Sequence, residues 1–394
     1  MTSATERLDR DLLVEQAIAT AGADDFGEPT WTEGLDHLLT SLRDEARLND
    51  LGVEIATGEV VGYLATRLAI TAWRAEHPEV AAGPVERPIV IVGQPRTGTT
   101  ILYDLLAQDP RLRAPLTWEV DAPCPPPETA TFATDPRIAT SQATLELADS
   151  IIPGFTDFHP LGATLAQECV RITAGDFRSM IFPAQYRVPS YDRWLLHEAD
   201  MAPAYRWHRR FLQHLQSRHP ASRWLLKSPA HLWHLDALAG EYPDAVVVQT
   251  HRDPLKVIAS VSALAAHLRR MASDETSVAE AADEYADDIL VGLERGMAAR
   301  DRNVFPAEQV VDVHFSSFLA DPIGVIAGLY GRFELELTPE VADRMRAFLA
   351  AHPGDGGGGG TRYRFADTGL DAEELRERAA AYQERYAVES EPVT

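Results

Sequence analysis

The stretch PIVIVGQPRTGTT, residues 88–100, decides the fold of this chain. Its apolar start runs into glycine, which predicts a short buried strand of a parallel sheet. A helix is expected from Thr99 to about residue 107. Gly93, Gly98, Thr99 and Thr100 match the spacing G-x-x-x-x-G-[KST]-[ST] of a phosphate loop, whose backbone N–H groups face an anion.

The loop departs from that of a nucleotide triphosphatase. Thr99 stands where such a loop has its lysine, and a later strand ends in His251 and Arg252 rather than in an aspartate that could hold magnesium. A magnesium–triphosphate site is therefore poorly supported. Arg96 supplies a cation inside the loop instead, so the predicted anion-binding residues are Arg96, Thr97, Gly98, Thr99 and Thr100.

Three further apolar runs predict strands, at residues 223–227, 244–251 and 309–315, and a helical pattern follows each of them. Strands that alternate with helices indicate an α/β fold, here a phosphate-loop-like parallel sheet flanked by helices. Ligands of such sheets bind at the carboxyl ends of the strands.

The rest of the chain is mostly helical. We expect residues 1–84 to form a helical N-terminal lobe that packs on the core, and residues 85–394 to form the α/β domain. A helical insertion at about 130–222 carries aromatic residues that form core or the wall of an apolar substrate pocket. The tract Gly356–Gly360 is expected to be a mobile loop.

A second group of polar residues follows the other strands. Lys227 ends one run, and Arg252 ends another, with Ser260 about two helical turns further on. Of 36 basic residues only Lys227 and Lys256 are lysine. Because arginine stands at all the other basic positions, the two remaining lysines suggest that an ammonium group is needed there. Arg252 and Ser260, on a face that Lys256 also approaches, predict a second anion site, separate from the loop. Two anion sites without a metal suggest a nucleotide that is phosphorylated at two places.

Taken together, PRTGTT, Lys227 in LLKSP, Arg252 in R-D-P and Ser260 resemble the sulfotransferases that use 3'-phosphoadenosine 5'-phosphosulfate, in particular their bacterial branch. The resemblance runs from about residue 85 to 390 and includes HFSSFLADP near residue 314. It implies that the loop binds the 5'-phosphosulfate, and that Arg252 and Ser260 bind the 3'-phosphate. In the segment GTRYRF only Arg362 carries a cofactor contact over, because the basic tripeptide of related chains is absent.

Sulfuryl transfer also needs a base for the acceptor hydroxyl. The resemblance implies a glutamate shortly after the loop helix, and Glu119 in PLTWEV is favoured, with His231 as the alternative. Lys227 and Arg96 would neutralise the charge that develops on the leaving group.

The composition limits the partners. A net charge of -24 and a pI near 4.9 disfavour binding to nucleic acid and to anionic membranes. No apolar stretch reaches the ~18 residues of a membrane span, and Cys124 and Cys169 lack zinc spacing. We expect a cytoplasmic protein without a metal, whose oligomeric state the sequence does not indicate.

The leading hypothesis is a sulfotransferase that acts on a hydroxyl of a small apolar, lipid-like or phenolic acceptor. The alternatives are a small-molecule kinase with a degenerate phosphate loop, and a protein that binds adenosine 3',5'-bisphosphate without turnover.

Overall fold

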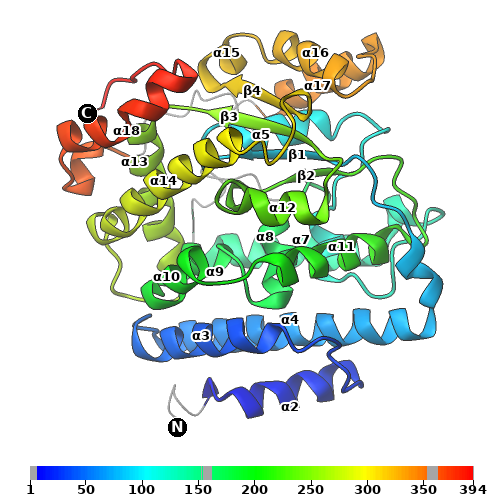
Figure 1. The fold of residues 1–394 in the computed structure, drawn as a ribbon. Helices are drawn as coiled ribbons and strands as arrows, with labels where there is room; N and C mark the ends of the chain where they lie inside the picture. Colours follow the sequence, from blue (N-terminus) through cyan, green and yellow to red (C-terminus); the bar gives the residue numbers. More distant parts are fainter. Residues whose placement is uncertain (1–6, 152, 154–161, 353–362, 394) are drawn as a thin grey trace.

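A computed structural model describes residues 7–151, 153, 162–352 and 363–393, which form a parallel sheet surrounded by helices (Figure 1). The sheet confirms the predicted α/β fold. Its strands follow the order β2-β1-β3-β4, and each is slightly shorter than the apolar run that predicts it. They are β1 (Ile89–Gly93), β2 (Leu225–Lys227), β3 (Val246–His251) and β4 (Val310–His314).

The three strands on the β2 side of the sheet are buried along their whole length. Along β1, Ile89 and Ile91 belong to one hydrophobic cluster, whereas Val90 and Val92 belong to another. Side chains of a strand alternate between the two faces, so each face of the sheet has its own apolar layer. This explains why the strands read as unbroken apolar runs in the sequence.

Helices before the sheet form the blue layer at the bottom of Figure 1. Leu13, Leu35 and Leu64 of this layer share one hydrophobic cluster with Val90 of β1. A separate unit ending near residue 84 stays a prediction. The helices are α2 (Arg10–Ala21), α3 (Trp31–Asp44) and α4 (Asp50–Glu76).

The connection from β1 to β2 contains the predicted insertion, and its described residues are largely helical. It runs through α5 (Thr99–Leu106), α6 (Thr117–Asp121), α7 (Pro136–Ile151), α8 (Cys169–Thr173), α9 (Ile181–Gln185), α10 (Pro189–His197) and α11 (Ala202–Gln216).

The remaining helices connect β2 to β3, β3 to β4, and follow β4. Figure 1 shows α18 in red beside α13, close to the end of β3. Among the described residues, no helix combines the length and the apolar character that crossing a membrane needs. The elements are η5 (Pro229–His234), α12 (Leu235–Glu241), α13 (Pro254–Arg269), α14 (Val278–Asp301), α15 (Phe315–Ala320), α16 (Pro322–Arg332), α17 (Pro339–Ala351) and α18 (Ala372–Tyr386).

Candidate active site

The loop between β1 and α5 turns through two residues with positive φ, Arg96 at 66° and Gly98 at 83°. A Cβ on Gly98 would lie 2.8 Å from Cδ2 of Phe315, so the position requires glycine. The buried Thr97 hydroxyl donates to the Gln94 carbonyl oxygen at 2.6 Å and fixes the turn. The turn brings the first amides of α5, which lack partners within a helix, to the carboxyl edge of the sheet.

Lys227 is the last residue of β2 and pairs in register with Ile91 of β1. Its Nζ donates to Oγ1 of Thr100 in the loop helix at 3.0 Å and forms an ion pair with Glu168. The Lys227 side chain is 1% exposed, whereas that of Glu168 is 17% exposed. A nearly buried ammonium group and a partly accessible carboxylate therefore lie together beside the loop.

The sequence predicts that the second cluster is separate from the loop. In the structure, the cluster adjoins the loop. Arg96 Nε donates to Oγ of the buried Ser260 at 3.0 Å, and Arg252 Nη1 donates to the Arg96 carbonyl oxygen at 2.9 Å. The Arg252 guanidinium also stacks on the ring of Phe315, 4.2 Å from its centroid. Burial lowers the pKa of Arg96, but an arginine remains cationic at neutral pH.

Glu119 lies in α6, fully buried, at 0% exposure. One carboxylate oxygen accepts from Arg113 Nη2 at 2.6 Å and the other from the Leu116 backbone N–H at 2.9 Å. Burial raises the pKa of Glu119, and Arg113 partly offsets this effect. Arg113 in turn stacks over Trp224, next to β2, so the pair ties α6 to the sheet.

His231, the alternative base, lies in η5 and is 2% exposed. Its Nδ1 lies 2.8 Å from the Tyr205 hydroxyl, and burial holds its pKa well below the usual range, so the ring is neutral at pH 7. A small cavity borders His231, and Cys169 and Ser228, the residues that follow Glu168 and Lys227, also line it. The other lining residues mix apolar side chains, among them Met180, Leu195 and Met201, with polar ones, among them Thr173, Arg178 and Ser179.

Two sequence predictions lie outside the described residues: the contact of Arg362 and the behaviour of Gly356–Gly360. Among the described residues, no group of three or more His, Cys, Asp or Glu side chains is arranged to hold a metal ion.

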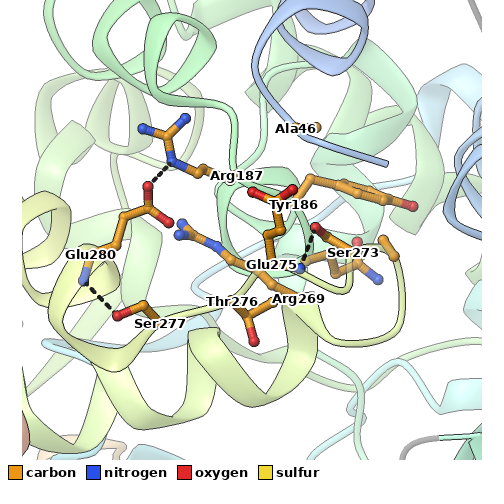
Figure 2. Close-up of a pocket in the computed structure, with 11 residues that line it drawn as sticks. Ala46, Tyr186, Arg187, Arg269, Ser273, Glu275, Thr276, Ser277 and Glu280 are labelled. Carbon is orange, nitrogen blue, oxygen red and sulfur yellow. Dashed lines mark hydrogen bonds and ion pairs between the residues drawn. The ribbon is translucent and has the colours of Figure 1, made fainter. Parts of the chain in front are cut away.

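Figure 2 shows a second hollow. It is lined by Arg187, Arg269 and Glu280, among others, and Arg187 Nε lies 2.9 Å from Oε1 of Glu280. Arg269 ends α13, the helix that begins just after Arg252, and 16 helical residues span roughly 24 Å. The hollow is therefore not part of the site around Arg252.

Sequence reasoning missed two carboxylates of the site, Glu168 and Glu391. Glu391 follows α18 and pairs with Arg252. Each lies far along the chain from its basic partner, by 59 and 139 residues. The near absence of lysine singled out Lys227, and a buried ammonium needs a partner, but no local pattern identifies which carboxylate supplies it.

A sequence profile described as the Sulfotransferase family matches residues 88–339, from β1 to the start of α17. The chain belongs to the sulfotransferase family. The matched range contains the loop, Lys227, Arg252 and Ser260, and the family predicted from the sequence is confirmed.

Three relatives of this sulfotransferase come from mycobacteria. The sulfotransferase STF1 of Mycobacterium tuberculosis H37Rv superposes with a TM-score of 0.83 at 34% identity, covering 95% of this chain and 98% of that one. STF9 of Mycobacterium avium gives a TM-score of 0.86 at 30% identity, over 96% and 97% of the two chains. The omega-hydroxy-beta-dihydromenaquinone-9 sulfotransferase Stf3 of Mycobacterium bovis is 26% identical over 67% of each chain.

Proposed function

We propose that this sulfotransferase moves a sulfuryl group from 3'-phosphoadenosine 5'-phosphosulfate to a hydroxyl of a small apolar, lipid-like or phenolic acceptor. The observation that carries the proposal is the contact of Lys227 with both Thr100 of the loop and Glu168. It brings a cation for the leaving group and a base for the acceptor to the same edge of the sheet.

The donor would bind through residues that already contact one another. The first amides of α5, with Thr99 and Thr100, suit the 5'-phosphosulfate. Arg252 and Ser260 suit the 3'-phosphate, and Arg96, which contacts both of them, lies between the two groups. Guanidinium groups match phosphate oxygens in geometry as well as in charge.

The bound donor supplies a sulfuryl group joined to a good leaving group, its 5'-phosphate. The acceptor oxygen bonds to sulfur as the bond from sulfur to the 5'-phosphate oxygen breaks, which leaves adenosine 3',5'-bisphosphate and a sulfate ester. Lys227 stabilises the negative charge that grows on the departing oxygen. The proton of the acceptor hydroxyl passes to a carboxylate of the protein.

We propose Glu168 as that carboxylate, ahead of the earlier candidates Glu119 and His231. Glu168 is partly accessible and contacts Lys227, so its carboxylate lies directly beside the cation proposed for the leaving group. Both oxygens of the buried Glu119 already accept hydrogen bonds, and this supports a role for Glu119 in holding α6. His231 lies deeper, against Tyr205.

The acceptor class rests on one observation, because the cavity beside His231 is too small to hold an acceptor group. The name of the relative Stf3 gives it a hydroxylated menaquinone as substrate, which is a lipid with a hydroxyl.

The test incubates the protein with donor labelled in the sulfuryl group and a panel of acceptors that contains a simple phenol and an ω-hydroxylated prenyl quinone. We expect a labelled sulfate ester, and its loss in Lys227→Ala but not in the control Arg346→Ala, which removes an exposed cation on α17. Absence of both labelled product and donor binding would refute the proposal. Magnesium-dependent ATP consumption instead would indicate a kinase.

A further inference from the structure

Glu391, which follows α18, forms a two-pronged ion pair with Arg252. Its Oε1 accepts from Arg252 Nε at 2.8 Å, and its Oε2 accepts from Arg252 Nη2 at 3.0 Å. An arginine binds a carboxylate and a phosphate through the same planar pair of N–H groups. The carboxylate of Glu391 therefore takes up the edge of Arg252 with which a phosphate would pair.

Three consecutive residues at the end of β3, His251, Arg252 and Asp253, contact α18 and the segment after it that carries Glu391. The Tyr382 hydroxyl of α18 lies 2.9 Å from Nδ1 of His251. Asp253 accepts from the Glu391 backbone N–H at 2.6 Å and pairs with both terminal nitrogens of Arg376, at 2.6 and 2.7 Å. These contacts deliver the carboxylate to Arg252 in a defined position.

Nη1 and one face of the Arg252 guanidinium are engaged as well. Its Nη1 donates to the Arg96 carbonyl oxygen, and one face of its guanidinium covers the ring of Phe315. Its side chain is 14% exposed. Burial lowers the pKa of Arg252 and the hydrogen bond to Glu391 raises it, and the net result is a raised pKa. A phosphate can pair with Nε and Nη2 only if Glu391 leaves, because two anions at this edge would also repel each other.

We propose that Glu391 is an intramolecular competitor of the nucleotide 3'-phosphate, and that donor binding requires the segment after α18 to release Arg252. The inference rests on the proposed function, because it needs Arg252 to bind the 3'-phosphate. Donor and product bisphosphate both carry this phosphate, so Glu391 weakens the binding of both. The observed affinity is the intrinsic affinity reduced by the fraction of molecules in which Arg252 is released.

The test is a calorimetric titration of wild type, Glu391→Gln and the control Glu389→Gln with adenosine 3',5'-bisphosphate and with adenosine 5'-monophosphate. Glu389 lies in the same segment and its side chain is exposed. We expect Glu391→Gln to bind the bisphosphate about tenfold more tightly than wild type, which corresponds to a released fraction of about one tenth in wild type. Its affinity for the monophosphate and both affinities of Glu389→Gln should be unchanged.

Unchanged or weaker binding of the bisphosphate by Glu391→Gln overturns the inference. If that happens while wild type still prefers the bisphosphate over the monophosphate, only the competition fails and the proposed function stands. If neither wild type nor Glu391→Gln distinguishes the two nucleotides, Arg252 does not bind a 3'-phosphate and both proposals fail.

A second measurement follows the segment directly. Amide hydrogen exchange of residues 387–393 in wild type should become faster when adenosine 3',5'-bisphosphate saturates the protein, and should not change with the monophosphate. Slower exchange with the bisphosphate would mean that the segment closes over the nucleotide, which contradicts the competition.

Discussion

Arg252 donates a hydrogen bond from Nη1 to the backbone carbonyl oxygen of Arg96, at 2.9 Å. The bond joins the end of β3 to the loop that follows β1. Because Arg96 also reaches Ser260 with its side chain, the phosphate loop and the Arg252 cluster form one continuous basic edge. A nucleotide with phosphates on both sides of its ribose can contact the two parts of this edge together.

Replacement of Arg252 should weaken nucleotides selectively. We expect Arg252→Ala to lower the affinity for adenosine 3',5'-bisphosphate by roughly 10- to 150-fold, since a hydrogen-bonded charge pair contributes about 1.5–3 kcal/mol. The affinity for adenosine 5'-monophosphate should fall much less. Calorimetry measures both affinities, with Arg346→Ala on α17, whose side chain is 59% exposed, as the control. An equal loss for the two nucleotides would argue against a 3'-phosphate at Arg252.

The two glutamates should separate into a chemical and a structural role. Glu168→Gln should bind donor nearly as wild type does and lose turnover by about 100-fold or more, the usual contribution of a general base. Glu119→Gln should instead lower stability by a few kcal/mol, since it leaves the buried Arg113 without its counter-ion.

Turnover at saturating donor and chemical unfolding measure these effects. If Glu168→Gln is fully active while a well-folded Glu119→Gln is inactive, the base is Glu119, as the sequence predicts. If both variants keep their turnover, the base role passes to His231, which a His231→Asn variant then examines.

Gly98 should tolerate no side chain. Gly98→Ala brings a Cβ against Phe315 at a backbone angle of +83°, and we expect it to cost about 1–3 kcal/mol and to weaken donor binding. The control is Gly328→Ala in α16, where a Cβ meets nothing within 4 Å and a helix gains about 0.5–1 kcal/mol. Denaturant midpoints compare the two, and equal stability of both variants would show that the loop can relax.

Buried histidines should make the fold sensitive to acid. Burial lowers the pKa of His208 to about 3, of His214 to about 4 and of His234 to about 3, from 6.5. The unfolded chain binds protons at these residues below pH 6.5 and the folded chain does not, so the stability present above pH 6.5 is lost as pH falls. Between pH 6.5 and pH 5, each of these histidines lowers the free energy of unfolding by about 2 kcal/mol.

Unfolding free energies measured between pH 7.5 and 5 check this prediction. His208→Gln should make the decline with falling pH shallower by the share of one group, whereas His197→Gln, at an exposed position, should leave the slope as it is. A wild-type stability that does not change over this range would contradict the expected neutral state of the three rings.

The sequence predicts the strands and the basic residues of the site better than the carboxylates that pair with them. Strands β1, β2 and β3 could be located because they are buried on both faces and therefore read as apolar runs, and the partly exposed β4 still carries three valines. Thr100, Lys227 and Arg252 could be placed at one edge because each lies where a strand ends or a helix starts. Glu168 and Glu391 could not, because which carboxylate meets which cation depends on how the chain passes over the sheet.

The burial of Glu119 has the same origin. Its position after the loop helix suits a base, but its burial against Arg113 depends on Trp224 and the carbonyl oxygen of Leu215, which come from distant elements. The adjacency of Arg96 and Ser260 is likewise a property of the packed sheet edge, because 164 residues separate them in the sequence.

The most direct test of the central claim compares wild-type affinity for adenosine 3',5'-bisphosphate with that for adenosine 2',5'-bisphosphate by calorimetry. Both carry the same charge, and they differ only in which side of the ribose presents the second phosphate to Arg252 and Ser260. We expect the 3',5'-isomer to bind at least about tenfold more tightly, the value of one well-placed charged hydrogen bond. Equal affinity for the two isomers would contradict it.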